Sequence, residues 1–386
     1  MKLSRRGDVA PFVVMEMSKT AFEMERAGRE VFHLEVGQPS TRAPAPALAA
    51  ARAALQDELL AYTDANGIPG LRERIALHYE ERYGVSAPAD RVVVTTGSSA
   101  AFVLTFLAVF DGAARVAIAA PAYPCYRNVL SAVDVEVIAV PVGPETRYQL
   151  TPEILDQLGP LDGVIVASPS NPTGSIIEAD AMAALCRWTR ERGVTLISDE
   201  IYHGIEFGTK AVTAAAYDPG AIVINSFSKY FSMTGWRIGW MLAPETLVRP
   251  LEKLGQNLYI SPPTLSQIAA CAAFEAREEL DGHVARYAAN RQIVLAGLPE
   301  LGITKYAPPD GAFFLYADVG HLTRDSVAFC RALLDATGVA ITPGVDFDPV
   351  RGATSIRISY ARDAQTIKAA MERMAAFVRD YARAGA

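Results

Sequence analysis

Lys229 is the residue whose type and surroundings first suggest chemistry. It follows an apolar run, 221–224, that predicts a buried strand, and Ser226, Ser228 and Arg237 lie close to it in the sequence. At the carboxyl end of such a strand an amine can form an imine with an aldehyde, while hydroxyl groups and a guanidinium hold a phosphate. A lone Ser-x-Ser-Lys is more often a solvated loop. Its meaning therefore depends on the rest of the chain.

Other polar residues also follow expected strands. Ser98 and Ser99 come after strand 92–96 and open an apolar helix, where free amides and hydroxyls form either an anion site or a simple N-cap. Tyr123 comes after strand 115–119. Its ring could stack on a planar ligand or serve only in packing.

Two further strands end in groups that could hold a ring. Asn171 follows strand 163–168, and its amide could donate to a phenolic oxygen, although Asn-Pro-Thr-Gly is also a common turn. Asp199 follows strand 194–198 and could keep a ring nitrogen protonated or cap the next helix. Tyr202 lies three residues later, on roughly the same side of a helical turn.

The elements that must position these groups alternate between strands and helices, which predicts an α/β fold. The expected strands of its large, mostly parallel seven-stranded sheet are 92–96, 115–119, 135–140, 163–168, 194–198, 221–225 and 236–242. Strands 313–319, 338–342 and 355–359 with helix 363–382 predict a smaller α+β part. We therefore expect a large domain over 40–275 and a small domain formed by 1–39 and 276–386.

The composition is that of an ordinary globular protein, with 51% hydrophobic and 20% charged residues among 386. A net charge of −7 argues against nucleic acid or an anionic membrane as a partner and favours small molecules. The four cysteines are widely spaced and the five histidines form no ligand-spaced pair, so we predict a cytoplasmic protein without a metal. The longest apolar run, 100–110, is too short to span a bilayer.

Because the carboxyl ends of parallel strands meet at one edge of a sheet, the candidate groups should converge on one ligand. They supply phosphate donors, a stacking face, a partner for a pyridinium nitrogen, partners for a phenolate and an imine-forming lysine. The ligand that needs all of these is pyridoxal 5′-phosphate. Gly37 is either a turn residue or a bare backbone amide that is presented to a carboxylate.

The chain resembles the class I/II aminotransferases of the fold type I pyridoxal-phosphate enzymes, in the branch of the bacterial aspartate aminotransferases. The resemblance spans nearly the whole chain. The matching stretches are Glu-Val-Gly-Gln-Pro (35–39), Tyr-x₄-Gly-x-Pro-x-Leu-Arg (62–72), Asn-Pro-Thr-Gly (171–174), Ser-Asp-Glu-Ile-Tyr (198–202), Ser-Phe-Ser-Lys (226–229), Met-Thr-Gly-Trp-Arg-Ile-Gly (233–239), Asp-Gly-Ala-Phe-Phe (310–314) and Arg-Ile-Ser-Tyr-Ala (357–361).

The resemblance implies a role for each candidate. Lys229 would bind the cofactor covalently and move a proton, and Asp199 would pair with the pyridine nitrogen. Asn171 and Tyr202 would hold the phenolic oxygen, and Tyr123 would stack on the ring. The residues implied for the phosphate are Ser98, Ser99, Ser226 and Arg237, next to Ser228.

The resemblance also implies how substrate and partner are held. Arg357 would grip the substrate α-carboxylate with two parallel hydrogen bonds, and Gly37 and Asn171 would complete the grip. Tyr62 would reach the phosphate of a neighbouring subunit, which implies a homodimer with shared active sites. The expected reaction moves an amino group from an L-amino acid to a 2-oxo acid in two alternating half-reactions.

Two alternatives use the same cofactor residues: a lyase that catalyses β-elimination or decarboxylation, and a module that senses pyridoxal phosphate without turnover. The preferred substrate stays open. Relatives specific for dicarboxylates carry an additional cation, for which Arg127, His203 and Arg42 are weak candidates here. Ser98 stands where aspartate-specific members often have a larger polar residue, which argues against strict aspartate specificity.

Overall fold

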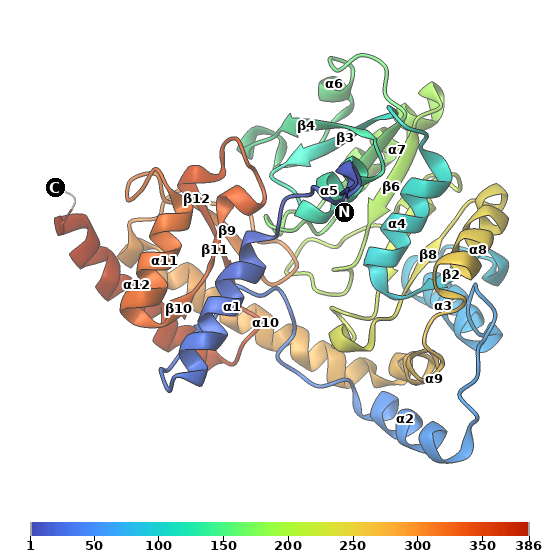
Figure 1. Cartoon of the computed structure of the whole chain (residues 1–386), viewed down its shortest axis with the longest axis horizontal. Coiled ribbons are helices and arrows are strands. Elements are labelled where there is room, and N and C mark those ends of the chain that lie inside the picture. Colours follow the sequence, from blue (N-terminus) through green and yellow to red (C-terminus); the bar gives the residue numbers. More distant parts are fainter. Residues whose placement is uncertain (1, 385–386) are drawn as a thin grey trace.

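A seven-stranded sheet forms the centre of the protein, which we describe from a computed structural model over residues 2–384 (Figure 1). Its strand order is β2-β8-β7-β6-β5-β3-β4. The strands are β2 (Val92–Thr95), β3 (Arg115–Ala120), β4 (Glu136–Pro141), β5 (Gly163–Ala167), β6 (Thr195–Asp199), β7 (Ile222–Ser226) and β8 (Gly239–Leu242). The predicted mostly parallel sheet is confirmed, with β8 antiparallel to both of its neighbours.

The register of the sheet places the carboxyl ends of β5, β6 and β7 side by side. Ala167 pairs with Asp199, and Asp199 pairs with Ile224. The apolar and β-branched runs of these strands are buried on both faces, as parallel strands between two helical layers require. β8 begins three residues later than predicted, because Arg237 has a φ of 49° and ends the short helix η5 (Thr234–Trp236).

Helices cover both faces of this sheet and build the rest of the chain. Their bounds are α1 (Val13–Arg26), α2 (Ala45–Asp57), α3 (Pro69–Tyr83), α4 (Gly97–Val109), α5 (Pro124–Ala132), α6 (Pro152–Leu155), α7 (Ala179–Arg192), α8 (Glu245–Tyr259), α9 (Thr264–Ala273), α10 (Arg277–Gly297), α11 (Ser326–Thr337) and α12 (Ala364–Ala384). Residues of α3, α7 and α9 share a core with one face of the sheet. Residues of α4, α5 and α8 pack on the other face.

Local sequence explains several of these helix ends. α3 starts with Pro69 in its first turn and ends at Gly84 with a φ of +65°, the left-handed conformation that suits glycine. α11 begins after Asp325, whose carboxylate accepts hydrogen bonds from the amides of Val327 and Ala328.

The second region contains two small sheets. β9 (Phe314–Asp318), β11 (Thr342–Pro343) and β12 (Ser355–Ser359) form an antiparallel sheet, and β1 (Phe32–His33) pairs in parallel with β10 (Val339–Ala340). The prediction of one strand over 338–342 was therefore wrong. The chain changes strand partners at Ile341. β10 pairs with β1 of the N-terminal segment, whereas β11 pairs with β12 in the antiparallel sheet.

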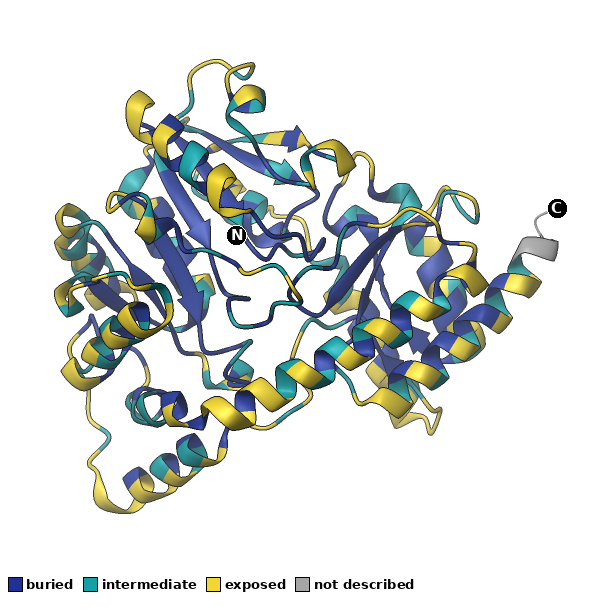
Figure 2. Cartoon of the chain, turned by 180° about the vertical axis from the view of Figure 1, so that it is seen from behind, coloured by how far each residue is buried: buried dark blue, intermediate teal, exposed yellow. Residues whose placement is uncertain are grey.

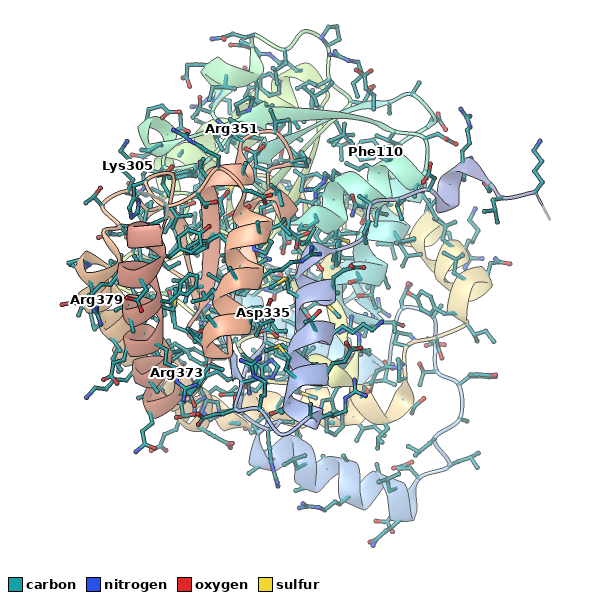
Figure 3. The ribbon with its side chains drawn as sticks, turned by 60° about the vertical axis from the view of Figure 1, so that its left-hand side comes forward. Phe110, Lys305, Asp335, Arg351, Arg373 and Arg379 are labelled. Atoms are coloured by element: carbon teal, nitrogen blue, oxygen red, sulfur yellow. The ribbon has the colours of Figure 1, made fainter. Side chains whose placement is uncertain are left out.

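The long helix α10 runs along one side of the molecule, from the region of α9 to the second region, with its outer face exposed (Figures 1 and 2). α11 and α12 lie against the small sheets, and Arg373 of α12 donates to the carbonyl oxygen of Thr337 at 2.9 Å (Figure 3). None of the described helices has the length and apolarity to cross a membrane.

Candidate active site

A cavity of about 240 Å³ lies where β5, β6 and β7 end, between the large sheet and the second region. It brings together most of the residues that the sequence singled out. Predicted residues in its wall are Gly37, Ser98, Ser99, Tyr123, Asn171, Asp199, Tyr202, Ser228, Lys229, Arg237 and Arg357. Ser226 and Tyr62 are the predicted residues that it leaves out.

Lys229 lies in the loop after β7, and its amine is buried in the cavity. The Nζ atom donates a hydrogen bond to the carbonyl oxygen of Gly37 at 2.6 Å. Burial, together with the positive charges of Arg357 and Arg237, lowers the pKa of Lys229 to about 8, and the nearby Asp199 opposes this shift. A substantial fraction of the amine is therefore neutral and nucleophilic near neutral pH.

Asp199 ends β6 with its carboxylate directed into the cavity. Oδ1 accepts a hydrogen bond from the amide of Ile201 at 3.1 Å, and Oδ2 accepts one from the hydroxyl of Tyr126. Burial raises the pKa of Asp199 to about 6, against the effect of these hydrogen bonds and of Lys229. The side chain is therefore an ionised, oriented acceptor at neutral pH.

Tyr126 was missed by sequence reasoning. It lies in the first turn of α5, three residues after Tyr123, so that both rings reach the cavity from one short segment. The available signal was this spacing, because positions three apart on a helix share a face.

The edge formed by α4 and η5 presents donors for an anion. Ser98 and Ser99 occupy the first turn of α4, and the Nη1 atom of Arg237 donates to the carbonyl oxygen of Thr234 at 2.9 Å. Gly97 has a φ of +74°, and a Cβ there would come within 2.5 Å of the Arg237 Nη2 atom. Only glycine lets the guanidinium pack so closely against the start of this helix.

Ser226 lies behind this edge rather than in it. The side chain is buried, and its Oγ atom is 2.9 Å from Oγ of Ser228 and 3.2 Å from the carbonyl oxygen of Ile238. Ser228 reaches the cavity and Ser226 supports it. Ser226 lies on the strand itself, whereas Ser228 is in the loop that turns toward the ligand space.

Arg357 reaches the cavity from β12 on the opposite side. Nη1 donates to Oδ1 of Asn171 at 2.8 Å, and Nη2 donates to the carbonyl oxygen of Glu35 at 2.5 Å and to Oγ1 of Thr342 at 3.2 Å. The guanidinium carbon lies 4.4 Å from the ring centre of Phe314. Burial lowers the pKa of Arg357 to about 10, so the group is still cationic at neutral pH.

Gly37 forms part of the wall between Lys229 and Arg357. A Cβ at this position would come within 2.5 Å of the Phe314 ring, so a larger residue would displace the loop or the ring. On the large-sheet side the wall is aromatic. Burial raises the pKa of Tyr123 and of Tyr202 well above the usual range of a phenol, so both hydroxyls are neutral hydrogen-bonding groups.

The mouth of the cavity is apolar and was not predicted. Phe12, Val14 and Met15, at the start of α1, form this side of the wall. The ring centres of Phe12 and Tyr123 are 5.9 Å apart. No local pattern signals this contact, because it depends on how the N-terminal segment crosses the molecule.

None of the cations considered for a substrate side chain lines the cavity. Arg127 donates instead to the backbone carbonyl of Asp346 at 2.7 Å, His203 is buried on the other face of the large sheet, and Arg42 lines a separate groove. Tyr62 is 79% exposed and does not line this chain's cavity.

Comparison with known proteins identifies the family. The protein-family model described as aminotransferase class I and II matches residues 29–374. A Mycobacterium tuberculosis protein named valine–pyruvate aminotransferase is 49% identical over 98% of both chains. A Thermus thermophilus protein named aspartate/prephenate aminotransferase is 31% identical, over 97% of this chain and 98% of its own.

Solved structures agree with this relationship. The crystal structure of an aminotransferase from Mycobacterium tuberculosis matches with a TM-score of 0.97 at 48% identity, covering 98% of this chain and all of the other. The aspartate aminotransferase of Thermus thermophilus with maleate matches with a TM-score of 0.92 at 30% identity, covering 97% and 99% of the two chains. With its seven-stranded sheet and the cavity at the strand ends, this chain belongs to the class I and II aminotransferases and is an amino-group transferase.

Proposed function

We propose that this aminotransferase works with pyridoxal 5′-phosphate in the cavity described above and prefers L-amino acids with apolar side chains as amino donors. The observation that carries the proposal is the placement of Lys229, Asp199 and Arg357 around one cavity. The class to which the chain belongs generally depends on this cofactor.

The residues of the cavity fit the cofactor. Its phosphate would be held by Ser98, Ser99 and Arg237, where the missing Cβ of Gly97 leaves room for the guanidinium. Asp199 would accept a hydrogen bond from the ring nitrogen, and Tyr126 keeps the carboxylate turned toward it. Tyr123 and Tyr202 would take up the ring face and the phenolic oxygen.

When bound, pyridoxal phosphate supplies an aldehyde that bonds to amines and a ring that withdraws electrons from the substrate Cα. Lys229 would contribute the amine that holds the cofactor. As a neutral amine it would then accept the proton from the substrate Cα and donate it again. The lowered pKa of Lys229, about 8, suits a group that both accepts and donates this proton.

The substrate carboxylate would bind at Arg357. Phe314 and the carbonyl oxygen of Glu35 hold the guanidinium in place, so its fork is already oriented. Asn171 keeps its amide nitrogen free for a ligand, because its Oδ1 atom accepts from Arg357. Both residues can therefore fix an α-carboxylate while Lys229 works on the adjacent carbon.

The preference for apolar donors follows from the mouth of the cavity. Phe12, Val14 and Met15 offer apolar surface to a substrate side chain, and burying such a side chain contributes roughly 1.5–3 kcal/mol. The cations in the described wall, Lys229, Arg237 and Arg357, are already assigned to cofactor or carboxylate. The relative named valine–pyruvate aminotransferase is consistent with this preference.

The test is the visible spectrum of the protein with its cofactor while L-valine, L-alanine, L-aspartate and L-lysine are added singly without an oxo acid. We expect the cofactor band to convert to a stable pyridoxamine spectrum with valine and alanine, and far more slowly with aspartate or lysine. A band that returns while an oxo acid and ammonia accumulate would indicate a lyase instead. Faster conversion by aspartate would refute the apolar preference.

We also propose a homodimer in which Tyr62 reaches the partner's phosphate site. Tyr62, Leu55 and Leu59 are exposed by 79%, 62% and 90% along α2 and the segment after it, which is unusual for large apolar groups on a free surface. Mixing Tyr62→Phe with Lys229→Ala subunits tests this. If the sites are shared, the mixed dimer has one doubly impaired site and one intact site, so activity exceeds that of either variant. A purely monomeric species in sedimentation would contradict the dimer.

The division into two domains, 40–275 against 1–39 with 276–386, is likewise a proposal. It is supported by a separate apolar core that joins the segment around Met17 and Leu34 to residues of α10, α11 and α12. Limited proteolysis should release fragments that end near residues 40 and 276.

A further inference from the structure

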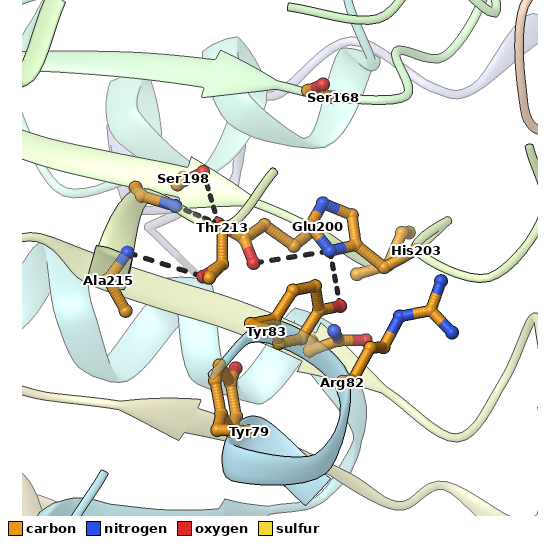
Figure 4. Close-up of polar contacts among 12 residues, drawn as sticks. Tyr79, Arg82, Tyr83, Ser168, Ser198, Glu200, His203, Thr213 and Ala215 are labelled. Carbon is orange, nitrogen blue, oxygen red and sulfur yellow. Dashed lines mark hydrogen bonds and ion pairs between the residues drawn. The ribbon is translucent and has the colours of Figure 1, made fainter. Parts of the chain in front are cut away.

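Glu200 directly follows Asp199 but faces the opposite side of the large sheet. Figure 4 shows it beside Ser198, His203 and Tyr83. Asp199 points to the side where Tyr126 of α5 lies, and Glu200 points to the side covered by α3 and α7. The glutamate is completely buried. Its Oε1 atom accepts hydrogen bonds from Oγ of Ser198 at 3.0 Å and from the amide of Ala214 at 2.8 Å.

The second carboxyl oxygen of Glu200 has no hydrogen-bond partner. The nearest basic group is Nδ1 of His203, 3.5 Å away, and this nitrogen is 2.7 Å from the hydroxyl of Tyr83. The Tyr83 hydroxyl is therefore the closer hydrogen-bond partner of this nitrogen, whichever of the two groups donates. Burial and the positive charge of Arg82 lower the pKa of His203 to about 3, so the neutral form prevails.

Among the described residues, none offers a positive charge that pairs with Glu200. The titratable side chains that interact with it electrostatically from β6, the following turn, α3 and α7 are Asp199, His203, Tyr79, Tyr83 and Cys186. Arg82 acts on His203 and Tyr83, and its guanidinium pairs with Glu206 at 3.1 Å. Lys229 acts on Asp199 from the other face.

An ionised carboxylate without a cation is very unfavourable in a protein interior, and a second negative charge on the preceding residue makes it more so. We infer that Glu200 is a protonated, neutral acid at neutral pH, which anchors the Asp199–His203 turn while leaving Asp199 as the negative charge at the end of β6. Consistent with this geometry, burial raises the pKa of Glu200 to about 8.

Glu200 would thus be a positioning residue in the reaction. Its effect on catalysis rests on the role proposed for Asp199. The hydrogen bonds of Oε1 tie the turn to Ser198 and to the loop at Ala214, which helps to hold the preceding residue, Asp199, with its carboxylate toward the cavity. A proton on Oε2 removes the repulsion that would otherwise favour protonation of Asp199. Asp199 can then stay ionised and hold a proton on the ring nitrogen.

Infrared difference spectroscopy tests the protonation without reference to activity. The spectrum of the purified holoenzyme minus that of Glu200→Gln, both at pH 6.5, should contain the carbonyl stretch of a buried carboxylic acid. The band should move in Tyr83→Phe, where the acid proton can turn to the vacated Nδ1 of His203. It should stay in Tyr79→Phe, which removes another buried hydroxyl from the same helix. A carboxylate band in place of the acid would overturn the inference.

Kinetics and cofactor affinity test the positioning role. Glu200→Gln keeps the shape and the neutral charge, so kcat and the dissociation constant for pyridoxal phosphate should stay within about threefold of the wild type. Glu200→Leu removes the acceptor for Ser198 and Ala214 and should lower kcat and weaken cofactor binding by tenfold or more. A Gln variant as impaired as the Leu variant would show that the charge matters and would refute the neutral acid. The infrared test does not depend on transamination. If no transamination is detected, the spectrum still confirms or refutes the protonation of Glu200.

Discussion

The cavity has one end at Arg357 and another at Lys229 and Asp199, which we call the carboxylate end and the cofactor end after the roles proposed for these residues. Behind each end lie a buried glutamate and a nearby histidine, and the two pairs differ in their contacts. Behind the carboxylate end, Glu35 lies 2.9 Å from Nδ1 of His33, whose other nitrogen is 3.7 Å from the half-exposed Glu25. Behind the cofactor end, Glu200 is 3.5 Å from Nδ1 of His203, and Tyr83 is closer to that nitrogen.

The difference shows that the same residue pair can make different contacts. His33 lies within hydrogen-bond distance of Glu35 and between two acids. At His203 the Tyr83 hydroxyl is the closer partner, so Glu200 has no direct hydrogen bond to the imidazole. A third residue, glutamate in one case and tyrosine in the other, sets the contact. Changes at the two ends of the cavity should therefore have different effects.

The largest effect should come from removing the amine at the cofactor end. Lys229→Ala should lose about 10³-fold or more in kcat, because no other group in the wall can both hold the cofactor and move the Cα proton. Steady-state transamination with L-valine and pyruvate measures this, with exposed Lys210→Ala as the control. Near-normal turnover in the variant would exclude Lys229 from the reaction.

At the other end, Arg357→Lys should raise KM for amino and oxo acids by roughly 10- to 100-fold, because a point charge replaces a two-pronged donor. The effect on kcat should be smaller. Arg379→Lys, on an exposed face of α12 (Figure 3), is the control and should leave KM unchanged. Unchanged constants in Arg357→Lys would remove the carboxylate end from substrate binding.

The pH dependence of cofactor attachment reports on Lys229 alone. Its pKa is lowered from 10.5 to about 8, so the reactive neutral amine predominates above that pH and declines about tenfold per unit below it. The rate of covalent attachment of pyridoxal phosphate to apoenzyme should rise between pH 6.5 and 8 and level off above. Stopped-flow absorbance measures it. A rate that keeps rising to pH 10 would show an amine with an ordinary pKa.

The smallest effect should separate the two glutamates. Glu35→Gln alters the acceptor that His33 contacts directly and should cost about 1 kcal/mol of unfolding free energy. Glu200→Gln should cost less, because a neutral amide replaces a neutral acid that makes no direct hydrogen bond to its histidine. Urea denaturation of both variants compares them. Equal costs would mean that the direct contact with His33 contributes nothing to stability.

Much of the fold and site could be predicted because the information is local. Lys229, Asp199 and Asn171 directly follow apolar strands, and strand ends in a parallel sheet must meet. Their functional roles stay predictions, as does the cytoplasmic location. The split of 338–342 into two strands could not be predicted, because it depends on which neighbour each half finds.

Other features depend on contacts between distant segments. Tyr126 is oriented by Asp199, 73 residues further along the chain. Phe12 and its neighbours enter the wall only because Asp346 binds the amides of Val13 and Val14, at 3.0 and 3.3 Å. The sequence contains no periodic pattern that marks such long-range pairs. The role of Tyr62 toward a second chain stays a proposal.

The fixed guanidinium of Arg357 also has a consequence for which amines can react. Its partners from Glu35, Asn171 and Thr342 leave it no freedom to follow a longer substrate. If Arg357 binds the substrate carboxylate as proposed, the fixed span between this guanidinium and the amine of Lys229 should select substrates by length. We expect acids whose amino group is one carbon from the carboxylate to react, and β-alanine and γ-aminobutyrate to be excluded.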